Sequence, residues 1–494
     1  MKIVVANSVG IDDQGYFIIH SPSRWSEGVE NKENWFAYYP WELAYTSSLL
    51  KTATPHTIKF IDGCLECLCS RDYIEKIALE KPDWLIMESA TRVIEDNLKI
   101  ALKIKKRFNT RLIFCGQHAT AYPEELLKQG VDFVCLGEYE NTVLDIILGK
   151  KPSKIKGLYP NQRRPLLDIN TLPFPEDKDV SRLNYGLPGE PSSEYLEIQM
   201  YATRGCLMSC TYCVARNLYY EKPNYRVRDI QNIIQELKYL KNKYPKLEGI
   251  FFDEEDHTGN KIFNLNLSQA IIESKLHNLH YEAMCNLYNL DEEIMNSMKE
   301  AGYYKLRVGI ETGSPTLAQQ INKPFDLNKI RETLKVAKKT GLKMYGTFMF
   351  GLPPGNKKED LKTISLIKEL IQKQYLHNVQ ISILTPQPIT PFFKQIEKPF
   401  LSTKEYKRFD GGRISIINYP EYSSQQIKAL HTYALNMRDH LFLTNKIKHG
   451  LFSWIKIIYS KQGGFALMKK LFLRMSKEIN FLKNRKKTEK KLFN

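Results

Sequence analysis

Three cysteines are the residues of this 494-residue sequence whose type and spacing most directly imply chemistry. Cys206, Cys210 and Cys213 lie on one short segment, separated by three and then two residues. Thiolates grouped in this way bind iron–sulfur clusters or zinc. A closed structural zinc site needs a fourth ligand, and the neighbouring sequence offers none. On a four-iron four-sulfur cluster, three cysteines leave one iron open, which suits a catalyst better than an electron carrier.

Alternating strand and helix patterns precede the cysteines over residues 1–150. Each candidate strand is a short apolar run, as expected of strands that are covered on both faces. Helical patterns separate them, and an irregular stretch from Ser8 to Tyr39 interrupts the first unit. This order predicts an N-terminal doubly wound, Rossmann-like parallel sheet. The candidate strands are residues 2–7, 57–62, 83–88, 111–116 and 132–138.

A second strand–helix series contains the cysteines and predicts a partial (β/α)6 barrel over residues 196–400. In such barrels the chemistry lies at the carboxyl ends of the strands. Residues 151–195 are rich in Pro, Asn, Asp and Ser and read as a linker. Residues 401–494 are expected to form a helical, basic C-terminal extension. The two strand–helix series place the chain in the α/β fold class. The candidate barrel strands are residues 197–203, 248–253, 280–286, 304–310, 343–350 and 379–385.

The cysteine segment resembles the signature of the radical S-adenosylmethionine (SAM) superfamily. It reads Cys-x-x-x-Cys-x-x-Cys, it follows the first barrel strand, and the aromatic Tyr212 precedes the last cysteine. The resemblance implies a [4Fe–4S] cluster on Cys206, Cys210 and Cys213, with S-adenosyl-L-methionine bound at the open iron. It also implies an external electron donor, such as flavodoxin or ferredoxin, and cleavage of SAM to a 5′-deoxyadenosyl radical.

Further strand ends resemble the SAM-binding segments of the same superfamily. The carboxylate of Glu311 is placed to accept hydrogen bonds from ribose hydroxyls, and the glycine segment 346–351 lets the backbone approach adenine. Residues 388–391 resemble a Pro-Gly-Thr-Pro turn of the superfamily, but Ile389 replaces its glycine. The residues implied to contact SAM are Tyr212, Asp253, Glu254, Glu311, Ser314, Gly346 and Gly351.

The N-terminal series resembles the cobalamin (B12)-binding domain that precedes many radical SAM modules. Small residues at its strand ends leave room for a flat macrocycle and its nucleotide tail. The Asp-x-His-x-x-Gly motif of enzymes that ligate cobalt with a protein histidine is absent, with Gln14 in place of the histidine, so no histidine ligand to cobalt is expected. We expect His118 to form hydrogen bonds beside the tail instead. The implied cobalamin contacts are Ser89, Gly116, His118, Ala119, Thr120, Gly137 and Glu138.

The other six cysteines are interpreted as not binding metal. Cys64, Cys67 and Cys69 form a second cluster, but no paired set of ligands is evident elsewhere in that domain, so incidental thiols are favoured. Cys115, Cys135 and Cys285 fall within apolar strands and are expected in the core.

The positive charge is concentrated at the C-terminus. Of the formal net charge of +17, the residues from Lys446 onward contribute 14 Lys or Arg and two acidic residues. Apolar and basic residues over 451–483 predict either a helix packed on the barrel or an amphipathic helix on anionic lipid. Gly463-Gly464 and the poor aromatic interleaving disfavour nucleic acid. The pattern favours a lipid or other hydrophobic small-molecule substrate.

The N-terminus, MKIVVAN, does not resemble a signal peptide, and no apolar run reaches about 18 residues. The protein is therefore expected to be cytoplasmic, with peripheral membrane contact through the basic tail as a further hypothesis.

These features favour a cobalamin-dependent radical SAM methyltransferase that acts on an unactivated carbon. Relatives in the superfamily also carry out cyclisations, so a cyclase stays open. A methylthiotransferase is a second alternative, but Cys64, Cys67 and Cys69 lie too close together for the extra cluster of those enzymes. A third alternative is a non-catalytic cobalamin or iron–sulfur sensor.

Overall fold

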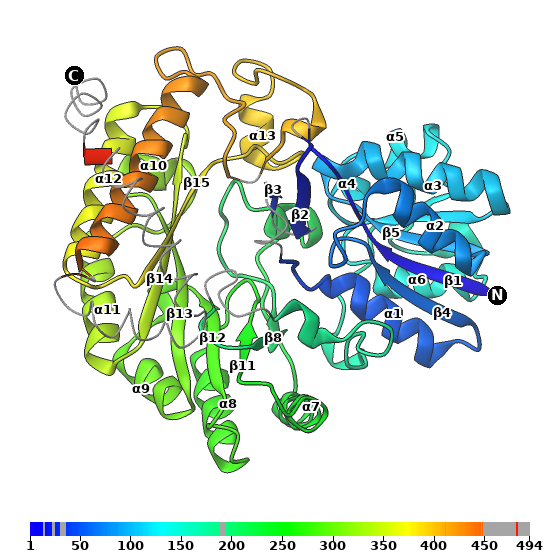
Figure 1. Ribbon diagram of the computed structural model, residues 1–494, viewed down its shortest axis with the longest axis horizontal. Helices are drawn as coiled ribbons and strands as arrows, with labels where there is room; N and C mark the ends of the chain where they lie inside the picture. Colours follow the sequence, from blue (N-terminus) through cyan, green and yellow to red (C-terminus); the bar gives the residue numbers. More distant parts are fainter. Residues whose placement is uncertain are drawn as a thin grey trace, which may run out of the picture.

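The computed structural model describes residues 1–12, 15–21, 25–29, 36–186, 193–410, 412–445, 447 and 481–482. Two parallel sheets dominate the described part of the chain, one near the N-terminus and one in the second half. Figure 1 shows the N-terminal domain in blue and cyan beside the larger, green-to-yellow barrel domain. This arrangement confirms the predicted fold class.

The N-terminal sheet has five parallel strands in the order β4-β1-β5-β6-β7. Alternate residues of β1 face opposite cores, because Val4 packs with α2, α3 and α5, whereas Ile3 packs with α1 and α6. The sheet is therefore covered on both faces, as predicted. Its elements are β1 (Lys2–Asn7), α1 (Trp41–Ala53), β4 (Thr57–Asp62), α2 (Ser70–Glu80), β5 (Trp84–Glu88), α3 (Ile94–Phe108), β6 (Arg111–Cys115), α4 (Gly116–Ala121), α5 (Pro123–Lys128), β7 (Phe133–Val134) and α6 (Glu140–Ile147).

The stretch between Ser8 and Tyr39 is more regular than the sequence indicated. It contains an antiparallel hairpin of β2 (Phe17–Ser21) and β3 (Trp25–Val29). Strands of five residues are too short to show a convincing alternation in the sequence, which explains the difference.

The second sheet has six parallel strands in the order β15-β14-β13-β12-β11-β8, so each strand pairs with the next one along the chain. Helices pack on its outer face, as expected of a partial barrel. Helix α8 was not predicted, because polar Asn264 and Ser268 share its buried face with apolar residues. The elements are β8 (Glu197–Met200), α7 (Ile230–Lys243), β11 (Gly249–Phe252), α8 (Lys261–Glu273), β12 (His280–Cys285), α9 (Glu292–Glu300), β13 (Tyr303–Glu311), α10 (Pro315–Gln320), α11 (Leu327–Thr340), β14 (Lys343–Phe350), α12 (Lys357–Gln372) and β15 (Asn378–Ile383).

After the barrel, α13 (Pro391–Ile396) is followed by an irregular segment and then by a helix over residues 424–445. The irregular segment returns to the N-terminal domain, where Lys407 accepts a hydrogen bond from buried Arg92 and Asp410 forms an ion pair with it at 2.8 Å. Figure 1 shows this part of the chain at the top of the view, reaching towards the N-terminal domain. The predicted basic tail lies outside the described residues, apart from 447 and 481–482. Within the described part of the chain, no helix combines the length and apolar character that a membrane span requires.

Candidate functional site

The cysteine loop begins where the first barrel strand ends. Met200 ends β8, the short strand β9 (Thr203–Arg204) follows, and Gly205 then turns the chain with φ of +104°. A Cβ at Gly205 would lie 2.7 Å from the carbonyl oxygen of Asn224, so only glycine fits this close approach. The loop therefore starts at the carboxyl edge of the barrel, where the sequence placed it.

Hydrogen bonds to the backbone hold the loop in place. The side-chain amide of Asn217, on the π-helical turn Ala215–Tyr219, donates to the carbonyl oxygens of Cys210 and Cys213 at 3.1 and 2.7 Å. The backbone NH of Thr211 donates to Ile321 at 3.1 Å. The loop is thus tied both to its own continuation and to the turn after α10.

The three thiols share a partly desolvated environment. Burial, with a smaller contribution from the neighbouring thiols, raises the pKa of Cys206 to about 12 and that of Cys213 to about 11. Burial also raises the pKa of Cys210. Clustered thiolates in such surroundings need a cationic centre. Among the described residues, no three His, Cys, Asp or Glu side chains could hold a single metal ion. Three cysteines on one loop suit an iron–sulfur cluster, in which each cysteine binds a different iron.

A carboxylate–ammonium pair lies beside these thiols. Glu311 ends β13 with φ of +68°, and its Oε1 lies 3.5 Å from Nζ of Lys323. The hydroxyl of Thr347 donates to the same carboxylate at 3.4 Å. Burial lowers the pKa of Lys323, but the net shift is upward because Glu311 and the thiols of Cys210 and Cys206 oppose it. Lys323 was missed by the sequence analysis, because it follows α10 without any recognisable spacing.

Glu254 was implied to contact SAM, but the structure gives both of its carboxylate oxygens partners within the chain. Oε2 accepts from the backbone NH groups of Ala202 and Thr203 at 2.5 and 2.9 Å. Oε1 lies 2.5 Å from Nδ1 of His257, whose Nε2 lies 2.7 Å from the hydroxyl of Tyr303. Glu254 is fully buried, so here it anchors the strand end that leads into the cysteine loop.

The remaining residues implied to contact SAM surround the same end of the barrel. Asp253 is buried directly after β11, and the hydroxyl of Ser314 caps α10 by accepting from the NH of Leu317. The backbone NH of Gly351 donates to Asp360 at 2.9 Å. A Cβ at Gly346 would contact Leu376, so this glycine faces the outer layer of the barrel. Tyr212 is on the cysteine loop itself, and burial raises the pKa of its hydroxyl well above the usual value.

The residues implied to contact cobalamin lie at the carboxyl edge of the N-terminal sheet, and several already have partners in the chain. Ser89 accepts from Asn97 at 3.1 Å, and Thr120 donates to Gly116 and accepts from the NH of Gly137. Ala119 lies in the core. Whether these residues contact cobalamin stays a prediction.

His118 is fully buried in the N-terminal domain. Its Nδ1 lies 3.4 Å from the hydroxyl oxygen of Thr91, and its ring packs edge-to-face against Tyr406 at 4.9 Å. Burial lowers the pKa of His118 to about 3, so the imidazole is neutral at physiological pH. These contacts agree with a hydrogen-bonding role for this histidine.

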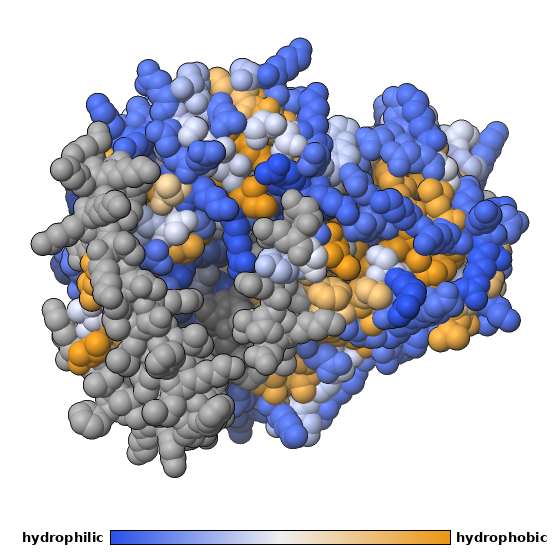
Figure 2. Space-filling view, turned by 45° about the horizontal axis from the view of Figure 1, so that its top comes forward, coloured by the Kyte–Doolittle hydropathy of each residue, from blue (hydrophilic) through white to orange (hydrophobic). Residues whose placement is uncertain are grey.

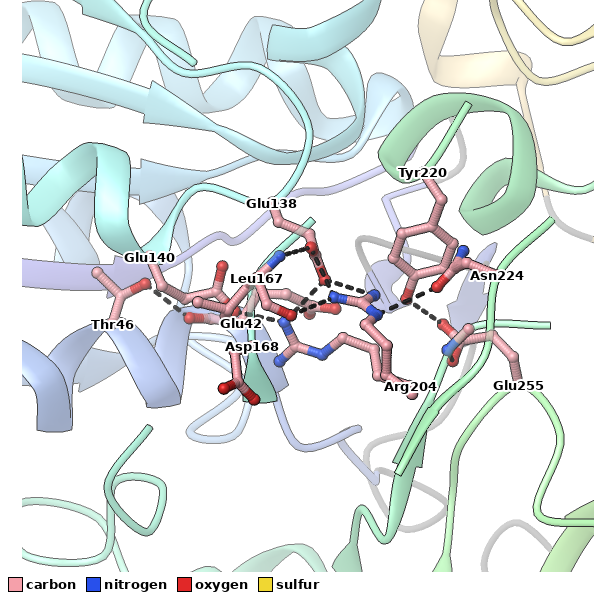
Figure 3. A network of polar contacts seen from close by, with 12 residues as sticks. Glu42, Thr46, Glu138, Glu140, Leu167, Asp168, Arg204, Tyr220, Asn224 and Glu255 are labelled. Carbon is pink, nitrogen blue, oxygen red and sulfur yellow. Dashed lines mark hydrogen bonds and ion pairs between the residues drawn. The ribbon is translucent and has the colours of Figure 1, made fainter. Parts of the chain in front are cut away.

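A buried ion network joins the two domains at Arg204, two residues before Cys206 (Figure 3). Arg204, which is 2% exposed, forms ion pairs with Glu140 at 2.7 Å and with Glu138 at 3.2 Å. Arg226 binds both oxygens of Glu138 at 2.9 Å. Burial raises the pKa of Glu138, but Arg204 and Arg226 outweigh it and hold the pKa below the usual value. The network fixes the carboxyl edge of the N-terminal sheet against the cysteine loop.

Several buried polar atoms at this same edge have no hydrogen-bond partner among the described residues. They include Oε2 of Glu88, the hydroxyl of Tyr139 and Oε2 of Glu140. Burial and the neighbouring Glu42 raise the pKa of Glu88 well above its usual value. Because unpartnered buried polar groups are costly, they indicate that a polar ligand or ordered water belongs here. The amide groups around a corrin ring would meet this need.

Comparisons with known proteins agree with this geometry. The model of the radical SAM superfamily matches residues 200–367. The uncharacterized methyltransferase PH0819 of Pyrococcus horikoshii is 27% identical over 409 residues, covering 79% of this chain and 85% of the relative.

Two solved structures share the fold at low sequence identity. OxsB, a cobalamin-dependent S-adenosylmethionine radical enzyme, superposes with a TM-score of 0.70 at 12% identity and covers 97% of this chain and 71% of OxsB. TsrM, a radical S-adenosylmethionine methyltransferase from Kitasatospora setae, gives a TM-score of 0.62 at 14% identity and covers 80% of this chain and 75% of TsrM. Residues 200–367 of the chain match the radical SAM superfamily, and this domain follows a Rossmann-like N-terminal domain.

Proposed function

We propose that this protein is a cobalamin-dependent radical SAM methyltransferase that acts on an unactivated carbon. The observation that carries the proposal is the position of Cys206, Cys210 and Cys213 on one loop at the carboxyl edge of the barrel. The carboxyl edge of the N-terminal sheet is held against the same loop by Arg204. The similarity to PH0819, which is described as a methyltransferase, supports methyl transfer, and OxsB and TsrM share the fold.

In this proposal, the three cysteines hold the [4Fe–4S] cluster and the surrounding strand ends hold SAM. When bound, these groups supply a 5′-deoxyadenosyl radical, and cobalamin carries the methyl group to be transferred. Lys323 and Glu311 provide opposite charges beside the thiols, which suits a zwitterionic ligand such as the methionine part of SAM. Thr347 fixes the Glu311 carboxylate at 3.4 Å. Tyr212, Asp253, Ser314 and Gly351 complete the proposed SAM site, whereas Gly346 faces away from it.

For cobalamin, the support is the edge at which Ser89, Gly116 and Gly137 lie, together with the unpartnered atoms of Glu88 and Tyr139. The Asp-x-His-x-x-Gly motif is absent from the sequence, so we infer that no histidine of this edge binds cobalt. Residue 14, where some relatives place their histidine, lies outside the described residues. We keep 1–150, 151–195, 196–400 and 401–494 as the proposed division of the chain.

Three finer points belong to the same proposal. An external flavodoxin or ferredoxin would supply the electron. The basic tail would rest on an anionic membrane surface, and a hydrophobic part of the substrate would suit that location. These points depend on the composition of the tail.

The experiment is anaerobic purification with added cobalamin, followed by analysis of iron, sulfide, cobalt and 5′-deoxyadenosine. The wild-type chain should contain about four iron atoms and form 5′-deoxyadenosine from SAM after reduction. Cys206→Ala should lose the cluster and the product. The matched control is Cys69→Ala, because Cys69 is also half-buried but precedes α2, away from the loop.

The possible outcomes separate the alternatives. Iron that persists in Cys206→Ala would favour a methylthiotransferase with a second cluster. An intact cluster that forms no 5′-deoxyadenosine would favour a sensor and contradict the proposal. Cobalt that fails to copurify in the wild-type chain would contradict its cobalamin part. A methylated product distinguishes methyl transfer from cyclisation.

A further inference from the structure

The inner face of the barrel carries a polar stripe along β13. Lys305, Arg307, Gly309 and Glu311 alternate along this strand, so their Cα–Cβ directions point to the same face. In the sheet register, Arg307 lies between Met284 of β12 and Tyr345 of β14. Arg307 is therefore on the lumen side, below the Glu311 carboxylate that lies beside the cysteines.

The guanidinium of Arg307 is buried and held rigidly. It lies between the rings of Phe251 and Tyr345, at 4.4 and 4.8 Å from their centroids. Its Nε donates to Glu282 of β12. The side chain is 6% exposed, yet its Nη2 has no hydrogen-bond partner among the described residues. The planar guanidinium of Arg307 is thus held in place while its Nη2 donor has no partner in the described part of the chain.

Arg307 shares its carboxylate partner with a second basic side chain. Glu282 also forms an ion pair with Lys305 at 3.1 Å, so one carboxylate serves two basic side chains. Arg307 stays charged under all working conditions. Glu282 therefore does not satisfy every donor of the guanidinium, and Nη2 is the donor without a partner among the residues that the structure describes.

The lumen beside Arg307 is open to solvent. Met284, Gly309 and Thr347 are partly exposed, whereas Ala283, Val308 and Phe348, which point to the other face of the same strands, are buried. On the face shown in Figure 2, the molecule is hollowed between the barrel and the N-terminal domain, and hydrophilic side chains lie above the hollow. Arg307 itself is 6% exposed, so a molecule in the lumen would meet the small exposed part of its side chain.

We propose that Arg307 binds an oxyanion of the substrate, a carboxylate or a phosphate, at the floor of the barrel lumen. Arginine suits this task because its planar fork matches both groups and the charge strengthens each hydrogen bond. Four residues of strand separate Arg307 from Glu311, which is about 13 Å at 3.3 Å per residue. The proposed substrate is thus an anionic molecule. That the anion belongs to the substrate rests on the proposed function, whereas the anion site itself rests on the geometry.

The test is calorimetric titration of the reconstituted full-length protein with inorganic phosphate and, separately, with acetate, in chloride buffer. The wild-type protein should bind one of them saturably at one site. Arg307→Met should weaken that binding at least tenfold, because a charged donor is lost. Arg307→Lys should give an intermediate loss, since it keeps the charge but not the fork. Tighter binding of phosphate points to a phosphorylated substrate, and tighter binding of acetate points to a carboxylate.

The matched control is Arg331→Met, an arginine on α11 that pairs with Glu369 at the surface, and its binding should equal that of the wild type. If Arg307→Met and Arg307→Lys bind the anion as tightly as the wild type, or if the wild type binds neither anion, the assignment is wrong. Formation of 5′-deoxyadenosine by the wild-type protein without substrate is measured in parallel. It tests the proposed function separately, because it does not require an anion.

Discussion

Arg204→Met would remove the cation that two buried carboxylates share between the domains. Glu138 keeps a partner, because Arg226 binds both of its oxygens at 2.9 Å. Glu140 is in a worse position: it is 1% exposed, its Oε1 pairs with Arg204 at 2.7 Å, and its Oε2 has no partner among the described residues. The cost of the substitution should therefore fall mainly on Glu140.

Breaking one side of a buried ion pair costs about 3 to 5 kcal/mol, because a charge remains without compensation. Since Arg226 still neutralises Glu138, we expect the lower end, about 3 kcal/mol. The double variant Arg204→Met/Glu140→Gln removes the stranded charge as well. It should recover roughly 2 kcal/mol of that loss, which a double-mutant cycle measures as coupling.

The assay is urea unfolding of the full-length chain, followed by circular dichroism at constant pH and salt. The surface variant Arg331→Met is the control and should change stability by at most about 1 kcal/mol. If Arg204→Met unfolds within about 1 kcal/mol of the wild type, the network does not hold the domains together. If Glu140→Gln brings no recovery, the cost does not arise from Glu140.

Three further predictions concern Asp360, Gly309 and Tyr303. Burial raises the pKa of Asp360 from 3.8 to about 7, so the folded chain binds this proton more tightly than the unfolded chain. The free energy of unfolding of the wild type should therefore fall relative to that of Asp360→Asn as pH rises from about 4 to 7, by up to about 1.4 kcal/mol per pH unit. Urea unfolding at several pH values measures this difference, and equal pH profiles of the two proteins would contradict the prediction. Gly309→Ala places a Cβ 2.3 Å from the Glu311 carboxylate, so the affinity for SAM, measured by equilibrium dialysis, should drop severalfold. The control Gly412→Ala places its Cβ 3.3 Å from Ser382 and should bind SAM as the wild type does. Tyr303→Phe removes the hydroxyl that faces His257 and should cost about 1 to 2 kcal/mol in thermal unfolding, and an unchanged midpoint would show that this contact is dispensable.

Most of the fold could be read from the sequence, because parallel strands that are covered on both faces leave a simple pattern. The runs at 2–7 and 57–62 coincide with β1 and β4, since every residue with a buried side chain there is apolar or small until the strand ends. Helix α8 shows the limit of this reasoning. Its buried face includes Asn264 and Ser268, while Ile262 is 72% exposed, so no apolar stripe marks it.

The candidate site was likewise only partly predictable from the sequence. Local spacing was sufficient to place Cys206, Cys210 and Cys213 on one loop. Local spacing did not reveal the role of Glu254. Its carboxylate accepts hydrogen bonds from the backbone NH groups of Ala202 and Thr203, which lie 52 and 51 residues earlier in the chain. Lys323 and Arg307 were missed for a related reason. Their importance depends on which strands and turns lie next to them in space, and single-sequence patterns carry no information about such neighbours.

The ion network of Arg204 also affects how activity screens of this protein should be interpreted. Cofactor, cosubstrate and substrate would all meet in a gap that neither domain encloses alone. A change at Glu140 would loosen the contact between the two domains and lower turnover, although this residue is not among those proposed to bind the cluster, SAM or cobalamin. A mutational scan scored by product formation alone would therefore misidentify a residue that joins the two domains as part of the chemical machinery. Scoring abundance and cluster content in the same scan would separate the two groups.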